Sequence, residues 1–378
     1  MSQSHIEDLG ASRSAAGEIA TAIKEPLRIL ISTHDFYPGL GGIETAAMTL
    51  ALGLAKRGYE VTVVTEAPGD SDGFPFKIVR QPSPLELIRL IRSTDLLWQN
   101  HISLRLAWPV FIFRRPTVFA HHIWLNVGMV PDLRFGSVKR LACMTGQNVF
   151  VSRELKKAAR LPGSVIPNSY DSATFHRVPE VPRDRDVAFL GRFVPVKGAD
   201  ILVDAIGLLA EQKLRLNATL IGEGPEDEAL KTRASARGIS ESIDFSGPVR
   251  GAPLARLLNR HKFVVVPSRW EEPFGIVALE ALACGCVVVV ADSGALPDVI
   301  GPCGPTVPKD DPPALAAALR SLLSDPSKLR AYRDAIPGHL EQFSEARHID
   351  ACEAVIHDTI RSWYRGGRSD TAHRSLEA

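Results

Sequence analysis

Short apolar runs alternate with helix-like segments along most of the chain, and this alternation constrains the fold more than any other feature. Near the start, "LRILIST" (27–33) has the length and β-branched character of a strand, "IETAAMTLALGLAKRG" (43–58) has helical periodicity, and "EVTVVTE" (60–66) is a second strand. A strand, a helix and a strand at this spacing predict a parallel βαβ unit. Because "DLLWQNH", "PTVFAHH" and "SVIPN" continue the series, we predict a parallel sheet for the first half.

The same pattern restarts after "HRVPEVPRDRD" (176–186), a Pro-rich and charged stretch that is typical of a linker. The predicted strands of the second half include "VAFLGRF", "LNATLIGEGP", "IDFSGPV", "KFVVVPS" and "CVVVVAD", and two helices are expected near the C-terminus. A chain of 378 residues is long enough for two domains with separate cores. The predicted fold class is α/β, with two doubly wound Rossmann-like domains that face a cleft.

The predicted organisation has six parts, of which two are folded domains. They are a flexible N-terminal extension (1–26), the N-terminal domain (27–175), the linker (176–186), the C-terminal domain (187–345), a helix that is a candidate to pack back on the first domain (346–365) and a flexible tail (366–378).

Composition excludes several classes of function. The net charge of +1 gives no global reason to expect a nucleic-acid partner. No apolar run reaches the roughly 18 residues that span a bilayer, and the N-terminus lacks the apolar core of a secretory signal. The five cysteines form no metal-binding spacing and suit a reducing compartment. Asp184 and Asp186 are interpreted as solvated charges rather than metal ligands, so we predict a cytoplasmic protein that needs no metal.

In doubly wound folds, ligands bind beyond the carboxyl ends of the strands. The loop "GLGGIE" (39–44) occupies such a position, and Gly41 and Gly42 would let the backbone approach a ligand while the helix N-terminus attracts an anion. Glu44 stands where a dinucleotide fingerprint requires glycine. The alternative is a tight strand-to-helix turn without a ligand.

The second half has a corresponding basic loop, "LGRFVPVKG" (190–198). Arg192 and Lys197 are five residues apart and follow a predicted strand, so these two cations can grip a diphosphate. The alternative is a pair of solvated basic side chains. Glu223, in "GEGP", lies at a neighbouring flexible strand end.

Two glutamates stand out in "EEPFGIVALEALACG" (271–285). If the segment is helical, Glu272 and Glu280 are about two turns or roughly 12 Å apart, which is too far to share a proton but suits two contacts on one elongated ligand. A salt bridge is the alternative for Glu280, because a glutamate among apolar residues needs a polar partner. The N–H groups of Phe274 and Gly275 precede the helix and are free for a ligand.

Histidines end two predicted strands of the first half. His101 follows "DLLWQN", and the pair His121–His122 follows "PTVFA". A histidine at either position can hydrogen-bond a ligand or transfer a proton. Packing in the core is the alternative for each.

These motifs resemble, in their order, the retaining glycosyltransferases of the GT-B fold, specifically family 4. The resemblance covers about residues 27–360 and is most specific in the E-x7-E element "EEPFGIVALE". "DFYPGLGGIE", "FVSRELKK", "VIPNSYDSATF", "FLGRFVPVKG", "LIGEGPE" and "FSGPV" precede it in the expected order. Cys286 replaces the usual proline and Ala295 a frequent glycine, but neither change removes a charge.

The resemblance implies a role for each motif. The second domain would hold a UDP-, GDP- or ADP-sugar without a metal, and the first would bind a saccharide or lipid-linked acceptor. Arg192 and Lys197 would neutralise the diphosphate, Glu280 would hold the ribose and Glu272 the donor sugar. Donor contacts are also implied for Phe274, Gly275, Glu223, Val249 (at the nucleobase), Gly41 and Gly42. His122 matches the family histidine, with His121 as the adjacent alternative.

The implied function is sugar transfer with retention, in the assembly of a cell-surface polysaccharide, lipopolysaccharide or glycolipid. The alternatives are another enzyme of this fold, either a sugar phosphorylase or a nucleotide-sugar epimerase, and a sugar-nucleotide binding protein without catalysis. A further hypothesis is attachment to the inner face of the membrane, because "PLELIRLIRS" (84–93) and "RLAWPVFIFRRP" (105–116) combine arginines with large apolar residues. Core elements with basic ends are the alternative for these segments.

Overall fold

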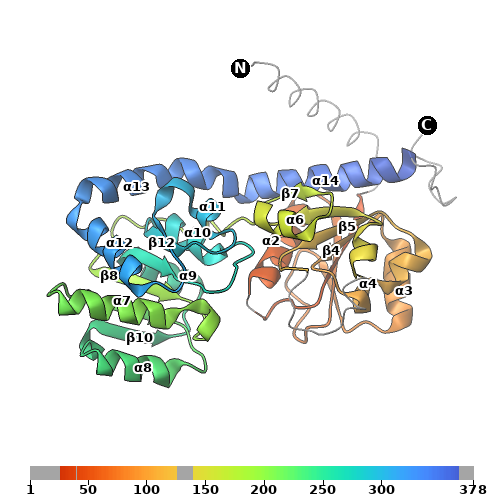
Figure 1. Cartoon of the computed structure of the whole chain (residues 1–378). Helices are drawn as coiled ribbons and strands as arrows, with labels where there is room; N and C mark the ends of the chain where they lie inside the picture. The colour runs from red at the N-terminus through yellow and green to blue at the C-terminus, as the bar shows by residue number, and fades with distance from the viewer. Residues whose placement is uncertain (1–25, 40, 126–138, 366–378) are drawn as a thin grey trace, which may run out of the picture. The chain divides into compact units, whose positions relative to one another are not determined.

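The computed structural model describes residues 26–39, 41–125 and 139–365, and Figure 1 shows their arrangement in helices and strands. These residues pack into two compact units. The first unit contains the described residues up to Phe119, residues 139–147 and the described stretch from Cys352 onward. The second unit contains residues 120–125 and 148–351. The segments predicted to be flexible lie outside the described residues except for Pro26. The domain bounds predicted from the sequence stay predictions.

The first sheet is seven-stranded, in the order β3-β2-β1-β4-β5-β6-β7. Its strands are β1 (Arg28–Thr33), β2 (Glu60–Thr65), β3 (Lys77–Arg80), β4 (Leu96–Asn100), β5 (Thr117–His121), β6 (Gln147–Phe150) and β7 (Ser164–Val165). β1 pairs in parallel with β2 on one side and β4 on the other, which confirms the predicted parallel sheet. The sequence did not predict β3, because only two of its four residues are apolar.

Helices cover both faces of the strands near β1. α3 (Pro84–Ser93) and α4 (Leu104–Phe113) share one apolar cluster with Leu30, Val64 and Leu97. α2 (Gly42–Lys56) packs on β1 and β2 outside that cluster. Since neighbouring strand residues point to opposite faces, the buried Ile29 and Ile31 lie on the other face from Leu30.

The second sheet is six-stranded, in the order β10-β9-β8-β11-β12-β13. Its strands are β8 (Arg185–Leu190), β9 (Ala218–Ile221), β10 (Ile243–Gly247), β11 (His261–Val266), β12 (Val287–Ala291) and β13 (Thr306–Val307). All adjacent strands pair in parallel. The chain leaves β8 towards β9 and β10, then returns to β11 on the other side of β8. The strand order therefore reverses between β8 and β11, and such a switch point is where ligands bind in folds of this type.

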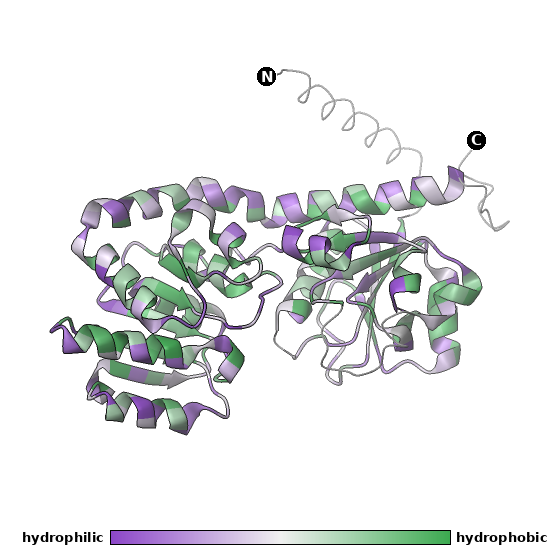
Figure 2. Cartoon of the chain, viewed as in Figure 1, coloured by the Kyte–Doolittle hydropathy of each residue, from purple (hydrophilic) through white to green (hydrophobic). Residues whose placement is uncertain are grey.

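Helices also lie on both faces of the second sheet. α7 (Ala199–Glu211), α8 (Asp227–Ala236) and α12 (Pro312–Ser324) share one apolar cluster with the strands. α9 (Gly251–Asn259) contacts β11, α10 (Ile276–Ala283) contacts β11 and β12, and α13 (Pro326–Leu340) contacts β12. Figure 2 shows the strands between these helices mainly in the hydrophobic colour. Val287 to Val290 are completely buried, which is why these strands read as continuous apolar runs.

The described C-terminal region contains three helices where two were predicted. α12 is separated from α13 by Asp325 alone, and α14 (Glu345–Arg365) follows. Asp325 caps α13 by accepting hydrogen bonds from the N–H groups of Ser327 and Lys328. A break of one residue does not interrupt the apolar periodicity, so the two helices look like one in the sequence.

The second half of α14 belongs to the first unit. The Tyr59 hydroxyl lies 2.7 Å from Oε1 of Glu353 and 2.8 Å from Nε2 of His357. Arg57 forms an ion pair with the same glutamate. These contacts attach residues of α14 to the turn between α2 and β2.

A short turn after β8 places the basic loop. Pro195–Lys197 form one turn of 3₁₀ helix, and Gly198 ends it with a left-handed backbone (φ +71°) before α7 begins. A Cβ atom on Gly198 would lie 2.2 Å from the carbonyl oxygen of Pro267, at the end of β11. The turn therefore packs directly against the start of the loop that follows β11, and only glycine fits there.

We predict that Gly198→Ala lowers the free energy of unfolding by about 2–4 kcal/mol, because the new methyl group meets backbone that must shift. Gly238→Ala is the matched control, since Gly238 has a similar φ of +65° but open space around its Cβ position. It should cost about 1 kcal/mol, from backbone strain alone. Chemical denaturation of both variants measures the difference, and equal losses would show that the packing on Pro267 is unimportant.

Candidate functional site

Two oppositely charged side chains meet at the switch point of the second sheet. Lys197, after β8, places its Nζ 2.6 Å from Oε1 of Glu272, in the loop after β11. The hydroxyl of Ser268 donates to the same oxygen at 2.7 Å. The glutamate side chain is 11% exposed and that of the lysine 29%. The structure therefore brings together two residues that the sequence analysis placed in separate roles, and adds Ser268, which it missed.

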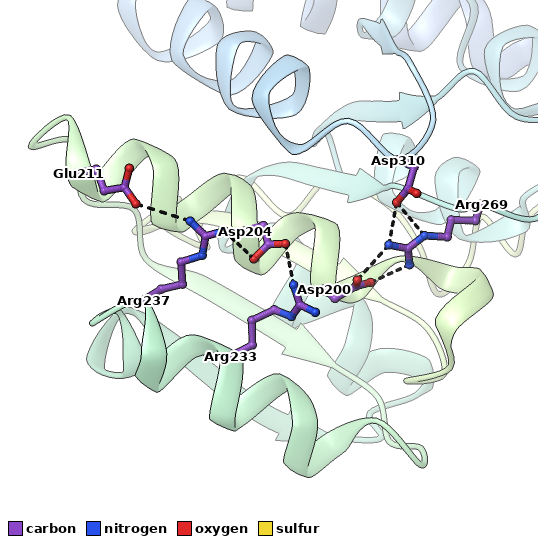
Figure 3. Close-up of polar contacts among 7 residues, drawn as sticks. All are labelled: Asp200, Asp204, Glu211, Arg233, Arg237, Arg269 and Asp310. Atoms are coloured by element: carbon purple, nitrogen blue, oxygen red, sulfur yellow. Dashed lines mark hydrogen bonds and ion pairs between the residues drawn. The ribbon is translucent and has the colours of Figure 1, made fainter.

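The loop after β11 is held against the 3₁₀ turn by Arg269. Its N–H and that of Trp270 donate to the carbonyl of Val196 at 2.9 and 3.2 Å. Its guanidinium binds both carboxylate oxygens of Asp200, at 2.8 and 2.9 Å, and also reaches Asp310 (Figure 3). Desolvation raises the pKa of Asp200, but hydrogen bonds and the charge of Arg269 outweigh it and lower that pKa overall. The ion pairs of Arg269 with Asp200 and Asp310 fix the loop that carries Glu272.

Glu271, the first residue of the Glu-Glu pair, has a structural role. Its Oε2 accepts a hydrogen bond from the N–H of Gly294 at 2.6 Å, and its Oε1 forms an ion pair with Lys309. The N–H of Ala295 donates to the carbonyl of Glu272 at 2.8 Å. Adjacent glutamates thus point to different partners, and the first joins the loop after β12 to the loop after β11.

The condition for the two-turn spacing of Glu272 and Glu280, a helix over both residues, is not met. α10 begins at Ile276, so Glu272 lies in the preceding loop and Glu280 is just over one turn into the helix. Gly275 is the N-cap residue, and Pro273 stands two residues before it. The helix start after Gly275 agrees with the prediction, and Glu280 lies about one turn rather than two turns inside the helix.

Glu280 lies in a largely apolar environment. Ala278, Leu279, Ala281 and Leu282, its neighbours on α10, are completely buried. Desolvation, with a further contribution from the charge of Asp171, raises the pKa of Glu280 to about 7. Within the described part of the chain, its carboxyl group makes no hydrogen bond or ion pair, so the alternative of a salt bridge is not observed. A partly exposed carboxyl group without a protein partner is available to a ligand.

The other predicted donor contacts follow the neighbouring strands. Arg192 is exposed after β8 and forms no ion pair with a carboxylate of the described residues. Glu223 is exposed after β9, and its backbone carbonyl accepts from the N–H of Phe193 at 2.9 Å. Val249 is half-buried after β10. All three lie at carboxyl ends of strands in the same sheet, as predicted.

The backbone before α10 offers two further donors. Phe274 is 5% exposed and packs edge-on against Phe343, with ring centroids 6.0 Å apart. The N–H groups of Phe274 and Gly275 donate to no acceptor in the described residues. They stand at the positive end of α10, which favours an anionic or hydroxyl ligand.

In the first unit, the predicted anion site at the start of α2 faces an acidic side chain. Gly41 is the N-cap residue and Gly42 the first residue of the helix. A Cβ atom on Gly41 would lie 2.5 Å from a carboxylate oxygen of Glu44. Asn100, at the end of β4, donates to the carbonyl of Ile43 at 3.0 Å and supports this turn. Glu44 satisfies part of the positive end of α2, so another anion would compete with it.

The structure distinguishes the candidate histidines. His121 is completely buried, stacks on Phe150 at 4.7 Å and places its Nε2 2.9 Å from Oδ1 of Asn148. Desolvation lowers its pKa, which keeps the ring neutral. His101 and His122 are half-buried. His121 therefore has a packing role, and His122 stays the better candidate for ligand binding.

No cluster of three or more potential metal ligands occurs in the part of the chain that the structure describes. Asp184 forms a bidentate pair with Arg260, and Asp186 forms an ion pair with Lys262 at 2.8 Å. The interpretation of these aspartates as solvated charges was incomplete, because both are bound to cations. The five cysteines are buried and unbridged.

We predict that the carboxyl group of Glu280 makes the free energy of unfolding depend on pH. Its pKa of about 7 lies above the ordinary value of 4.5, so the folded state binds more protons and loses stability as pH rises between these values. The difference corresponds to about 3 kcal/mol. Relative to the parent, Glu280→Gln should therefore become more stable as pH increases from 4.5 to 7.

Urea unfolding at a series of pH values measures this effect. Glu271→Gln is the control, because Lys309 holds the pKa of Glu271 below its ordinary value. That variant should lose stability relative to the parent as pH rises through the acid range. If the Glu280→Gln difference stays constant with pH, the carboxyl group is not desolvated.

Comparisons with known proteins identify the family. Residues 172–337 match the model described as "Glycosyl transferases group 1", and residues 40–173 match "Glycosyltransferase Family 4". A D-inositol 3-phosphate glycosyltransferase of Jonesia denitrificans is 34% identical over 167 residues, which are 42% of this chain and 39% of that protein. A GDP-mannose-dependent alpha-(1-6)-phosphatidylinositol monomannoside mannosyltransferase of Mycolicibacterium smegmatis is 28% identical over 352 residues, 80% of this chain and 91% of the relative.

Solved structures show the same fold. HepE of Anabaena, crystallised with UDP and glucose, has a TM-score of 0.75 at 21% identity, with 88% of this chain and 100% of that chain covered. Sucrose-phosphate synthase of Thermosynechococcus elongatus has a TM-score of 0.72 at 20% identity, with 91% and 100% covered. The chain spans less than half the length of several relatives that it matches at 32–36% identity. The two family models adjoin from residue 40 to 337, and the chain belongs to the group 1, family 4 glycosyltransferases of the GT-B fold.

Proposed function

We propose that the protein transfers a sugar, with retention of anomeric configuration, from a nucleoside-diphosphate sugar to a hydroxyl group of a saccharide or lipid-linked acceptor. The observation that carries this proposal is the meeting of Lys197 and Glu272 at the switch point of the second sheet. Glu280 and the free N–H groups at the start of α10 lie on the segment that follows. The names of relatives, which include GDP-mannose-dependent and inositol-phosphate glycosyltransferases, support the same class of reaction.

The charges at this site suit the departure of a diphosphate. As the bond between the anomeric carbon and the phosphate oxygen breaks, negative charge grows on that oxygen, and Lys197, Arg192 and the N–H groups before α10 can stabilise it. The acceptor oxygen bonds to the same face of the anomeric carbon, and its proton passes to the leaving phosphate oxygen. Glu272 positions the donor sugar through its hydroxyls and forms no bond to carbon.

Donor binding requires the ion pair of Lys197 to adjust. In the free protein this lysine is bound to Glu272, whereas a bound diphosphate would compete for the same ammonium group. The sugar hydroxyls would then donate to Glu272 in its place. Glu280 would accept from the ribose hydroxyls, so donor binding favours its ionised form.

A thermal-shift screen of UDP-, GDP- and ADP-sugars tests the proposal. We expect stabilisation by the sugars of one nucleotide, and at least about tenfold weaker binding in Lys197→Ala, because charged hydrogen bonds contribute about 1.5–3 kcal/mol. Lys262→Ala, which removes a lysine paired with Asp186 instead, should bind as the parent does. A chain that no nucleotide sugar stabilises would contradict the proposal.

The pH dependence of donor affinity tests the role of Glu280 separately. Because the pKa of Glu280 is about 7 in the free protein, affinity for a nucleotide sugar should fall as pH decreases from 8 to 6. The diphosphate diester of the donor does not titrate in this range, so the effect reports the protein. Glu280→Gln should bind weakly with little pH dependence, and a steep dependence in that variant would exclude Glu280 as its source.

Two other functions give different results in activity assays. A sugar phosphorylase would turn over a sugar phosphate without any nucleotide. A binding protein without catalysis would bind the nucleotide sugar but neither hydrolyse it nor transfer its sugar to an acceptor extract. We expect release of the nucleoside diphosphate, accelerated by the acceptor.

We also propose that the first unit associates with an anionic membrane surface. α4 exposes Trp108, Phe111 and Ile112, at 36%, 43% and 62% of their surfaces, and ends beside the exposed Arg114. Large apolar side chains next to a cation suit the interface of an anionic bilayer. None of the described helices combines the length and apolar character that are needed to cross a membrane.

Sedimentation with anionic vesicles at low salt tests this association. We expect binding that weakens with salt and falls about tenfold or more in Phe111→Ser/Ile112→Ser, because each change removes about 1.5–3 kcal/mol of apolar burial. Leu52→Ser is the control, since Leu52 is 40% exposed on a different helix, α2. The absence of binding by the parent would exclude a membrane role.

A further inference from the structure

Three arginines converge on the turn that follows α10. Arg177 and Arg183 come from the segment between β7 and β8, and Arg333 comes from α13. Gly285 lies in this turn, and a Cβ atom on it would be 2.7 Å from Nη2 of Arg183 and 3.6 Å from Cδ of Arg177. Arg183 also approaches the thiol of Cys286, with Nη1 3.6 Å from Sγ.

Arg333 has no counter-ion among the described residues. Its Nε and Nη2 atoms are buried and have no hydrogen-bond partner among the described residues. Desolvation lowers its pKa, and the charges of Arg183 and Arg177 lower it further. A half-buried cation near two others is unfavourable unless an anion accompanies it.

The described carboxylates do not supply that anion. Arg183 donates instead to the backbone carbonyls of His261 and Cys284. Neither Arg177 nor Arg333 forms an ion pair with any described residue, whereas many surface arginines of this chain do. The three positive charges are therefore uncompensated within the part of the chain that the structure describes.

The unpartnered edge of Arg333 has the geometry that binds oxyanions. Its Nε and Nη2 lie on one side of the guanidinium, where two parallel N–H bonds can reach two oxygens. Arg28 uses this edge on Asp95, at 3.2 and 2.8 Å, and Arg260 uses it on Asp184, at 2.9 and 2.6 Å. Arg333 is chemically equivalent, but the same edge has no partner among the described residues.

We propose that Arg177, Arg183 and Arg333 form a binding site for a phosphate group, either inorganic phosphate or a small phosphate monoester. Arg333 would bind two oxygens with its Nε/Nη2 edge once its half-buried side chain turns, because both atoms are buried in the free protein, and Arg183 would supply a fixed positive charge. Arg177 is exposed and would bind the anion from the solvent side. A phosphate, with close to two negative charges near neutral pH, compensates three cations better than a carboxylate does.

The site adjoins the helix that carries Glu280. Cys284 directly follows α10, and its N–H donates to the carbonyl of Glu280 at 3.1 Å. The carbonyl end of a helix repels an anion, but the carbonyl of Cys284 already accepts from Arg183. The proposed phosphate site shares no residue with the donor site, and its residues belong to none of the family motifs identified in the sequence.

Calorimetric titration with inorganic phosphate and with a hexose phosphate, at constant ionic strength in chloride, tests the proposal. We expect saturable binding of at least one of them, weakened at least about tenfold in Arg333→Met. Tighter binding of the hexose phosphate would identify a monoester as the ligand, and equal binding would identify the phosphate group alone. Arg330→Met is the matched control, because Arg330 is exposed on the same helix.

The melting temperature of Arg333→Met gives a second test, because its difference from the parent should change sign between chloride and phosphate. In chloride buffer Arg333→Met should melt at a higher temperature than the parent, since it removes an unpaired buried charge. In saturating phosphate the order should reverse, because only the parent gains binding energy. A variant that is less stable in chloride, or that keeps the full response to phosphate, would overturn the proposal.

Two further variants separate this site from the donor site and from a folding defect. Lys197→Ala should bind phosphate as the parent does, and loss of phosphate binding there would place the anion at the donor site instead. Arg177→Gln changes an exposed side chain, so it should fold normally while its phosphate affinity falls severalfold. If Arg177→Gln binds phosphate with parental affinity, the three arginines do not act together and the proposal fails.

Discussion

The pairing of β8 with β11 is the contact on which the candidate site depends. It brings together two loops whose charged residues, Lys197 and Glu272, are 75 positions apart in the chain. The side chain of Glu272 is only 11% exposed, and a carboxylate so buried is costly without a cation and a hydrogen bond. Lys197 and Ser268 supply both. The reversal of strand order therefore creates a place where an acidic and a basic group can coexist out of water.

Rigid support around this pair explains how it can serve a ligand. Arg269 ties the loop after β11 to α7 through Asp200, and Glu271 ties it to the loop after β12. If the protein binds a nucleotide sugar as proposed, these partners would hold the backbone while Lys197 turns from Glu272 to the diphosphate. Only side chains would then have to move, so less binding energy would be lost to reorganisation of the loop. Preorganised charge of this kind is what a departing diphosphate requires.

The sequence predicted the strands well and the long-range contacts poorly, for one physical reason. Strands such as Val287–Ala291 are buried on both faces, so local composition alone identifies them. A fully helical spacing of Glu272 and Glu280 does not occur, because α10 begins only at Ile276, after Pro273 and Gly275. The ion pair of Lys197 with Glu272 was not predicted, because it depends on which strands become neighbours. Ser268 carried no signal beyond its place after a strand.

The stretch between the two halves (176–186) makes contacts that its local sequence pattern does not predict. Its prolines and charges are typical of a linker, yet Asp184 and Asp186 are bound to cations, and the charges of Arg177 and Arg183 lower the pKa of Arg333. Burying Lys197 is offset by Glu272, whereas no described carboxylate offsets Arg333. A fold that retains an uncompensated charge loses stability by doing so. Unless an anion restores that balance, replacing the arginine with an apolar residue would be favourable, so the basic cluster itself is the argument for a ligand.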